Sequence, residues 1–373
     1  MTRRPLAALI LWGLPALALA ARPSPWNVVA SPNRGTLSNA LNGVSVAPDG
    51  TAWAVGHWYD QNLASYRTLT LRTAGGTLNT VASPNVGNGY NDLLGVAAFS
   101  SSEAWAVGYT RTSQYDPPRT LILHFTGDRW RTVSSPNPGP YDNTLYSVVA
   151  LAPDDVWAGG WYYDAQHFGR SLVVHWDGTR WSQVATPVSG TFDAVQALSA
   201  TGPDDVWAAG RTAVNGVYVA YSMHWDGSQW SVVSMPGVSG RGTQIRGLAA
   251  IAPDDVWAVG DSQNRSLMEH WDGTSWRIVN GVDLGAHYNV TWGVSARTGS
   301  AVWAVGYRYD DAGVVAMVQR WDGQSWRLEP MPTQSGVMPS LFAVSGAPSG
   351  ALWAVGLANT TDGDRTLTLH AFQ

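Results

Sequence analysis

The chain contains no cysteine, and this absence excludes several kinds of chemistry. Disulfide bridges, thiolate metal sites, cysteine nucleophiles and a lipid-anchoring cysteine all need a thiol that the sequence does not provide. Lysine is absent too, so all 22 basic residues are arginine. Charged residues make up only 13% of the chain, and its net charge is −5. This composition gives no basic surface for nucleic acid or anionic lipid.

Helical periodicity and long apolar runs are also scarce, except at the N-terminus. There, Arg3 and Arg4 precede an apolar run over residues 6–19, and Ala18-Leu19-Ala20 forms a small-residue cleavage site. This pattern predicts a signal peptide over residues 1–20. The mature chain, residues 21–373, is expected to be one domain, secreted or periplasmic. No later run is long and apolar enough to span a membrane.

What the sequence has in quantity is tryptophan and glycine, with 21 and 40 residues. A stretch close to Ala-Trp-Ala-Val-Gly recurs seven times at intervals of 46 to 52 residues. Its tryptophans are Trp53, Trp105, Trp157, Trp207, Trp257, Trp303 and Trp353. Short strand-like runs repeated at this period predict an all-β fold, a seven-bladed β-propeller with four antiparallel strands in each blade.

The third repeat shows the four expected strands, over residues 145–150, 156–160, 171–176 and 181–184. Proline and aspartate at Pro153, Asp154 and Asp155 predict a turn between the first two strands. Asp177-Gly178 predicts a two-residue type I′ hairpin between the last two strands, since that turn needs φ > 0 at both positions. The stretch between the second and third strands is expected to be a variable loop.

The seventh repeat stops after its third strand, and an unassigned strand at the other end of the chain matches the missing one. Residues 26–33 resemble the outer-strand segments of the first two repeats, with the shared ending Ser-Pro-Asn. The N-terminal strand is therefore expected to complete the last blade and close the ring, which removes the open interface of an incomplete ring.

Most repeated residues have a structural interpretation. The seven tryptophans are expected to pack between blades, because exposing all of them would carry a large apolar cost. The histidines of the third strands lie in separate blades, so they cannot converge on one metal, and they are expected to cap tryptophan rings or bond backbone. The Asp-Asp pairs lack the alternating oxygen ligands of a calcium loop. The sequence therefore assigns no catalytic residue, no metal site and no cofactor.

Two family resemblances follow from the repeat. The stretch from His270 to Trp276, His-Trp-Asp-Gly-Thr-Ser-Trp, resembles a shortened Asp-box turn of sialidase-like propellers. The wider order, Trp-x-x-Val, a small-residue inner strand, Val-Trp-Ala-Val and a strand ending in Gly-x-x-Trp, resembles tectonin and tachylectin-type lectin propellers over nearly all of the mature chain. These resemblances imply a propeller and a carbohydrate-binding role. Neither transfers a catalytic residue.

One face of the expected propeller is repetitive and the other is variable. The turns with Pro-Asp-Asp and Trp-Asp-Gly share the first face, and the second carries aromatic and acidic residues that differ between repeats. The candidate ligand-binding residues on the variable face are Trp58, Tyr59, Asp60, Tyr109, Tyr115, Trp161, Tyr162, Tyr163, Tyr307, Tyr309 and Asp310.

Aromatic planes stack on sugar rings, and carboxylates and amides bind hydroxyl groups, so a glycan or other extracellular ligand on this face is the leading hypothesis. Three alternatives stay open: a scaffold that binds a protein partner, a glycoside hydrolase or lyase whose face aspartates converge, and loop residues that merely pack onto the blades. The oligomeric state is undetermined.

Overall fold

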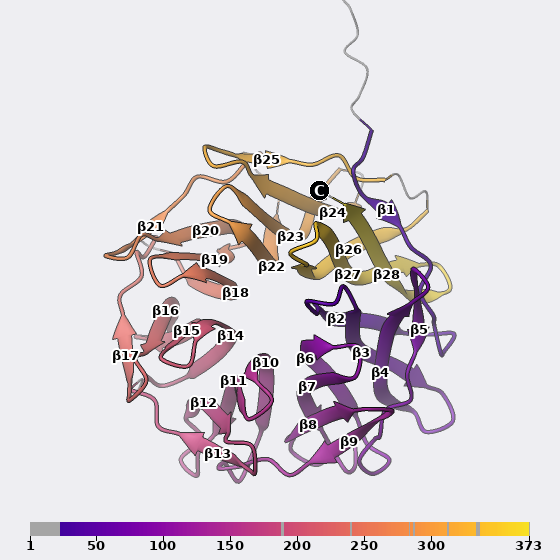
Figure 1. Cartoon of the computed structure of the whole chain (residues 1–373). Coiled ribbons are helices and arrows are strands. Elements are labelled where there is room, and N and C mark those ends of the chain that lie inside the picture. The colour runs from indigo at the N-terminus through magenta and orange to yellow at the C-terminus, as the bar shows by residue number, and fades with distance from the viewer. Residues whose placement is uncertain are drawn as a thin grey trace, which may run out of the picture.

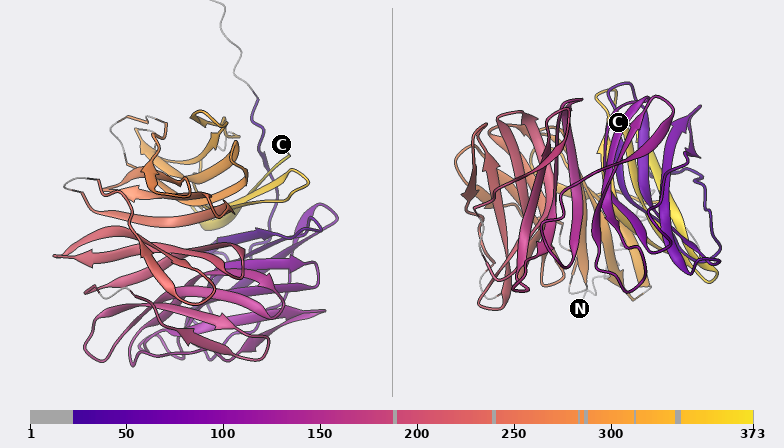
Figure 2. Two further views of the ribbon diagram at one scale, coloured as in Figure 1. Left: turned by 60° about the vertical axis from the view of Figure 1, so that its left-hand side comes forward. Right: turned by 90° about the horizontal axis from the view of Figure 1, so that it is seen from below.

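The computed structural model describes residues 23–372, except 188–189, 239–240, 283, 286–287, 312 and 333–335. The expected signal peptide, residues 1–20, lies outside the described residues. Seven four-stranded antiparallel sheets stand side by side around a central channel (Figures 1 and 2). The predicted seven-bladed propeller is therefore confirmed.

The strands follow one order in every blade, from the channel to the rim. Blades 1 to 3 consist of β2 (Asn39–Val46), β3 (Ala52–Asp60), β4 (Ser65–Ala74) and β5 (Thr77–Thr80); β6 (Asn91–Ser100), β7 (Glu103–Thr110), β8 (Arg119–Thr126) and β9 (Arg129–Val133); β10 (Asn143–Ala152), β11 (Asp155–Tyr163), β12 (Gly169–Trp176) and β13 (Trp181–Val184).

Blades 4 to 7 repeat the order, and the last one takes its outer strand from the N-terminus. They consist of β14 (Asp193–Gly202), β15 (Asp205–Val214), β16 (Val217–Trp225) and β17 (Trp230–Val233); β18 (Thr243–Ala252), β19 (Asp255–Ser262), β20 (Arg265–Trp271) and β21 (Trp276–Ile278); β22 (Asn289–Thr298), β23 (Ala301–Asp310), β24 (Gly313–Trp321) and β25 (Trp326–Leu328); β26 (Met338–Gly346), β27 (Ala351–Thr360), β28 (Gly363–Phe372) and β1 (Asn27–Val28).

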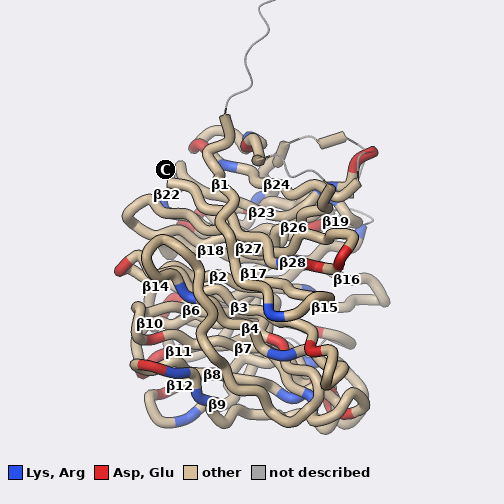
Figure 3. Tube along the Cα trace, turned by 90° about the vertical axis from the view of Figure 1, so that its right-hand side faces the viewer, with Lys and Arg blue, Asp and Glu red and all other residues tan. Residues whose placement is uncertain are grey.

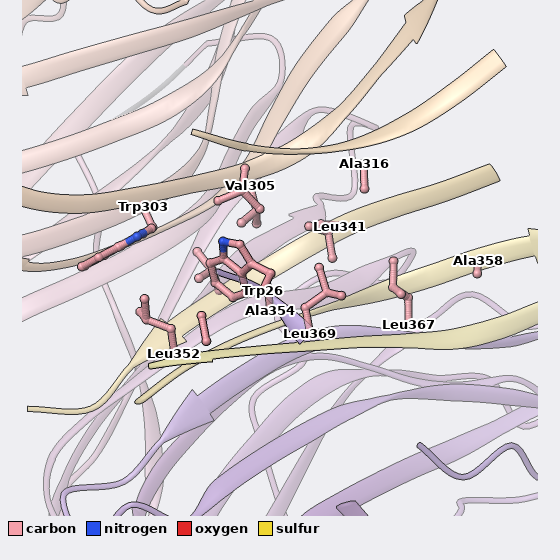
Figure 4. Close-up of a cluster of buried hydrophobic side chains, with 13 residues drawn as sticks. Trp26, Trp303, Val305, Ala316, Leu341, Leu352, Ala354, Ala358, Leu367 and Leu369 are labelled. Carbon is pink, nitrogen blue, oxygen red and sulfur yellow. The ribbon is translucent and has the colours of Figure 1, made fainter. Parts of the chain in front are cut away.

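Closure of the ring occurs as the sequence predicts. Strand β1 pairs with β28 through Asn27 and His370, and the Val29 amide donates to the Thr368 carbonyl at 2.9 Å. Trp26 is buried among side chains of blades 6 and 7, and its indole Nε1 donates to Glu329 at 2.6 Å. Figure 4 shows the Trp26 ring beside Val305 and Leu369.

The repeated tryptophans form the blade interfaces. All seven have 5% or less of their surface exposed, and each lies in a cluster that joins its blade to the next. In the first interface, Trp53 meets Trp130 of blade 2 edge to face, with ring centroids 5.3 Å apart. Similar pairs recur around the ring, and such contacts add to the hydrophobic stabilisation.

The repeated histidines cap the tryptophans, as expected, and have a second role that the sequence did not reveal. His175 stacks on Trp157 at 4.2 Å, and its Nε2 lies 2.8 Å from an Asp155 carboxylate oxygen. Blades 4 and 5 repeat this arrangement. The second aspartate of each pair therefore fixes a histidine as well as a turn.

Two details of the predicted blade are wrong. The Trp-Asp-Gly hairpin is not type I′, because only its glycine has a positive φ, for example 88° at Gly178. Instead the Asp177 carboxylate accepts the amides of Thr179 and Arg180 and shapes a longer turn. The second strands also continue past their glycines, so the supposed loop residues Trp161 and Tyr163 belong to β11.

Candidate ligand-binding site at the channel

Each innermost strand has a β-bulge at the same place, eleven residues before the repeated tryptophan. A bulge inserts one residue that is unpaired in the ladder and re-aims its side chain. The seven inserted residues line a cavity of about 410 Å³ in the channel. They are Asn42, Leu94, Tyr146, Gln196, Arg246, Trp292 and Phe342, called here the channel ring. A narrower space of about 160 Å³ lies against the following inner-strand residues.

At the channel ring the seven repeats carry seven different residues, whereas the neighbouring positions repeat. Small residues follow it, as at Gly43, Gly95 and Gly247, and a buried aliphatic residue usually precedes it, as at Leu41 and Leu93. A repeated framework that presents seven different side chains to one cavity is the expected form of a recognition site. Sequence reasoning missed these residues because it sought variation in the loops. Aligning the repeats on their tryptophans exposes this column.

A second layer is formed by the residues directly after the repeated glycines. It consists of His57, Tyr109, Trp161, Arg211, Asp261, Tyr307 and Leu357. Several of these side chains contact the channel ring or the neighbouring inner strand. Trp161 Nε1 donates to the Tyr146 hydroxyl at 3.0 Å, and Arg211 Nη1 donates to Gln244 Oε1 at 3.1 Å. The three sequence candidates Tyr109, Trp161 and Tyr307 therefore lie in the layer next to the cavity.

Blades 4 to 7 make one side of the cavity basic and aromatic. The Arg246 guanidinium lies 3.9 Å from the centroid of the Trp292 ring, and its Nε is 2.8 Å from Asp261. The Trp292 ring meets Phe342 edge to face at 5.6 Å. The aromatic surfaces and the guanidinium are thus held in fixed positions before any ligand arrives.

The side formed by blades 1 and 2 carries an acidic and amide cluster. Asp92 Oδ1 accepts from Asn42 Nδ2 at 2.9 Å and lies 3.0 Å from Nδ1 of His57. Burial opposes protonation of His57, but the Asp92 carboxylate outweighs it, so the pKa of His57 is raised. The two sides of the channel therefore differ in charge and in hydrogen-bonding capacity.

Tyr146 and Tyr109, near the cavity, remain neutral donors at ordinary pH. Burial raises the pKa of Tyr146, although its bond from Trp161 and the nearby Arg211 and Arg246 charges partly oppose this. Burial raises the pKa of Tyr109 as well. Their hydroxyl groups can therefore donate and accept hydrogen bonds but do not act as phenolates.

No protein-family model and no curated protein sequence matches the chain. Among solved structures, one described as YCF48 bound to a D1 peptide has a TM-score of 0.58 at 14% identity, over 95% of this chain and 97% of that one. Another, described as a polysaccharide lyase of family PL25, an ulvan lyase, bound to -[GlcA(1-4)Rha3S]-, has a TM-score of 0.55 at 10% identity, over 89% and 94%. At these identities the likeness is one of fold alone.

Four further aromatic candidates, Trp58, Tyr59, Tyr162 and Tyr163, are not among the cavity-lining residues and pack against neighbouring side chains. Trp58 and Tyr162 pack against the blade-interface clusters, and the Arg34 guanidinium lies 5.2 Å from the centroid of the Trp58 ring. Tyr59 meets Tyr66 edge to face at 5.3 Å, and Tyr163 meets Trp161 at 4.8 Å. These four aromatic side chains are half-buried rather than fully presented to solvent.

The acidic candidates shape turns or pair with a neighbour. Asp60 accepts the amides of Asn62 and Leu63, and Asp310 lies 3.4 Å from Arg308 Nε. Tyr307 stacks on Tyr288 at 5.9 Å. Among the sequence candidates, only Tyr115, 86% exposed, and Tyr309, 54% exposed, have side chains that are largely exposed to solvent. The structure thus places three of the sequence candidates in the layer beside the cavity and none of them among the residues that line it.

The described residues include no group of three or more His, Cys, Asp or Glu placed to hold a metal ion, and no helix that could cross a membrane. Within the same described residues, no Asp or Glu lines the cavity. In the side view of Figure 3, charged residues are sparse and no block of one sign appears.

Proposed function

We propose that this chain is an exported binding protein whose ligand is an extracellular glycan, bound in the cavity of the channel ring. The observation that carries the proposal is the ring itself: seven equivalent positions, seven different side chains and one shared cavity of about 410 Å³. This volume lies within the range of small-molecule sites, roughly 300–1,000 Å³.

The lining has the chemistry that sugars require. Tyr146, Trp292 and Phe342 supply aromatic surface, on which the C–H faces of a sugar ring pack. Asn42 and Gln196 supply amides that can donate to and accept from hydroxyl groups. Because these side chains project from paired strands rather than from loops, little ordering is needed on binding.

Two further observations support the glycan over other ligands. The repeat resembles that of tectonin and tachylectin-type lectins, and one structure with this fold holds a polysaccharide fragment. The predicted signal peptide would deliver the protein outside the cytoplasm, where such glycans are found. Cleavage after Ala20 is tested by mass spectrometry of the secreted protein, and a mature chain that begins at Met1 would contradict export.

A protein partner is the second candidate, favoured by the hairpin between β15 and β16. Val214, Val217 and Tyr218 are 50%, 47% and 42% exposed at its tip. One structure with this fold holds a peptide. Hydrolysis of a glycoside by a pair of carboxyl groups is not supported, because the described cavity side chains include no such pair.

The proposal is tested on a glycan array with the purified mature chain and two variants. Gln196→Trp fills the cavity with a larger side chain and should abolish any signal. Tyr115→Ala changes an exposed loop side chain outside the cavity and should leave the signal unchanged. An absence of any glycan signal, or signals that persist in Gln196→Trp with an unchanged melting temperature, would refute binding in the channel.

A further inference from the structure

We propose that the cavity recognises a carboxylate on its glycan, that is, an acidic sugar unit, and that Arg211 binds this group. The inference rests on the proposed glycan-binding function and adds the charge of the ligand to it. Three features of the basic side of the channel support it: the pairing of its two arginines, the surroundings of Arg211 and the donors beside it.

The two arginines that line the cavity are not equivalent. Arg246 has its charge balanced, because its Nε lies 2.8 Å from the buried carboxylate of Asp261. Arg211 forms no ion pair within the described part of the chain. Its Nη1 donates to the neutral amide oxygen of Gln244, and its Nε is buried with no hydrogen-bond partner among the described residues. Arg211 therefore brings an unbalanced positive charge to the cavity wall.

Aromatic rings hold the Arg211 guanidinium in place. Its Cζ lies 4.4 Å from the Tyr218 ring centroid and 5.4 Å from that of Phe192. A guanidinium placed against aromatic faces keeps its N–H edge available, and the planar fork matches the two oxygens of a carboxylate. A rigid, incompletely paired guanidinium is suited to bind an anion, since little side-chain entropy is lost when it does so.

Neutral donors accompany this charge. Burial raises the pKa of Tyr146, and the positive charges of Arg211 and Arg246 oppose this rise. Tyr146 and Gln196 line the same cavity as Arg211 and can bond the hydroxyls of the sugar that carries the carboxylate. On the far side, Asp92 is bonded to Asn42 and His57 and is not among the cavity-lining residues, so this acid is already paired.

The test compares each acidic glycan with its own neutral form. Fragments of oligogalacturonate, hyaluronan and alginate are arrayed beside their carboxyl-reduced counterparts, in which CH₂OH replaces the carboxylate. At least one acidic member should bind the mature chain about ten- to a hundredfold more tightly than its reduced form, as expected for one charge-assisted interaction. Its affinity should fall as salt concentration rises.

Variants of Arg211 assign the effect to this residue. Arg211→Gln should reduce binding of the acidic form to the level of its reduced counterpart without changing binding of the reduced form. Arg211→Lys keeps the charge but lacks the planar fork, and should retain part of the preference. Arg180→Gln, at a side chain 80% exposed on a Trp-Asp-Gly turn, is the matched control and should behave as wild type.

Failure of this inference is distinguishable from failure of the proposed function. If neutral glycans bind as well as their acidic forms, or if only sulfated glycans bind, the carboxylate site is refuted while glycan binding stands. If the acid preference survives both Arg211→Gln and Arg211→Lys, Arg211 is not the residue responsible. If no glycan of any kind binds the folded protein, the proposed function itself is refuted.

Discussion

Glu269 is a residue poorly suited to its surroundings. It lies in β20 opposite Ala258, where blades 1 and 2 have the apolar Leu71 and Leu123, and it is fully buried. Neither of its carboxyl oxygens has a hydrogen-bond partner among the described residues. Burial raises the pKa of Glu269 to about 8, so the folded protein holds this group neutral near neutral pH.

This pKa predicts a pH-dependent stability. Between about pH 5 and pH 8 the unfolded chain loses the Glu269 proton while the folded chain retains it. The unfolded state then binds fewer protons, and the free energy of unfolding should fall as pH rises, by roughly 1.4 kcal/mol per pH unit for one group. Below about pH 4, under the unfolded pKa of 4.5, both states are protonated and the effect disappears.

Denaturant titrations of wild type and Glu269→Gln at several pH values measure this contribution. The variant should match wild type near pH 4 and exceed it near pH 8, because an amide has no ionisation cost. Asp128→Asn, at a side chain 81% exposed, should retain the wild-type slope. Parallel slopes for wild type and Glu269→Gln would show that Glu269 ionises normally in the fold.

At the scale of the strand, the repeated glycine and the β-bulge act together: the glycine lets the first two strands approach closely just before the bulge. A Cβ on Gly160 would lie 1.9 Å from the Thr144 carbonyl oxygen, and the other six repeated glycines show separations of 1.9 to 2.1 Å. The inner strand crowds the second strand here, just before the bulge. The glycine therefore permits the close approach that sends one residue of each blade into the channel.

Replacement of this glycine should damage both the blade and the site. Gly160→Ala forces a Cβ against backbone atoms, and we expect a loss of several kcal/mol in the free energy of unfolding together with weaker ligand binding. Gly237→Ala is the control, because a Cβ there meets nothing within 4 Å. Thermal unfolding compares the two, and equal melting temperatures would contradict the proposed role of the glycine.

The blades and their closure could be predicted from the sequence, but the extent of the second strands and the bulges could not. The period of the tryptophans and the Ser-Pro-Asn match predicted the blades and their closure, because these features are repeated and local. The extent of β11 was underestimated, since Trp161 and Tyr163 resemble loop residues when their pairing partners are unknown. The channel ring was not predicted for a related reason: a bulge depends on the register between two strands, and a single-strand pattern does not show it.

At the scale of the whole molecule, the ring is held closed by a short strand and one tryptophan. Strand β1 contains only two residues, but Trp26 fills the interface between blades 6 and 7 and bonds Glu329. Asn33 and Ser31 extend the contact through bonds to Thr366. Closure fixes the relative positions of all seven channel-ring residues, and so it couples stability to the geometry of the site.

Loss of closure should therefore be costly. Deleting residues 21–35 is expected to lower the free energy of unfolding by several kcal/mol. Trp26→Ala alone should lower it by about 3–5 kcal/mol, as for other buried tryptophans. Tyr115→Ala should have no such effect. Calorimetry measures all three, and an unchanged melting temperature after the deletion would show that the N-terminal strand does not close the ring.

The central claim is that ligand occupies the channel ring, and hydroxyl-radical footprinting tests it most directly. The mature chain is oxidised with and without its strongest glycan ligand, and modification is quantified at each aromatic residue by mass spectrometry. We predict protection of Tyr146, Trp292 and Phe342, with unchanged oxidation of Tyr115. Protection confined to the exposed Tyr115 and Tyr309, or to the tryptophans of the Trp-Asp-Gly turns, would contradict binding in the channel.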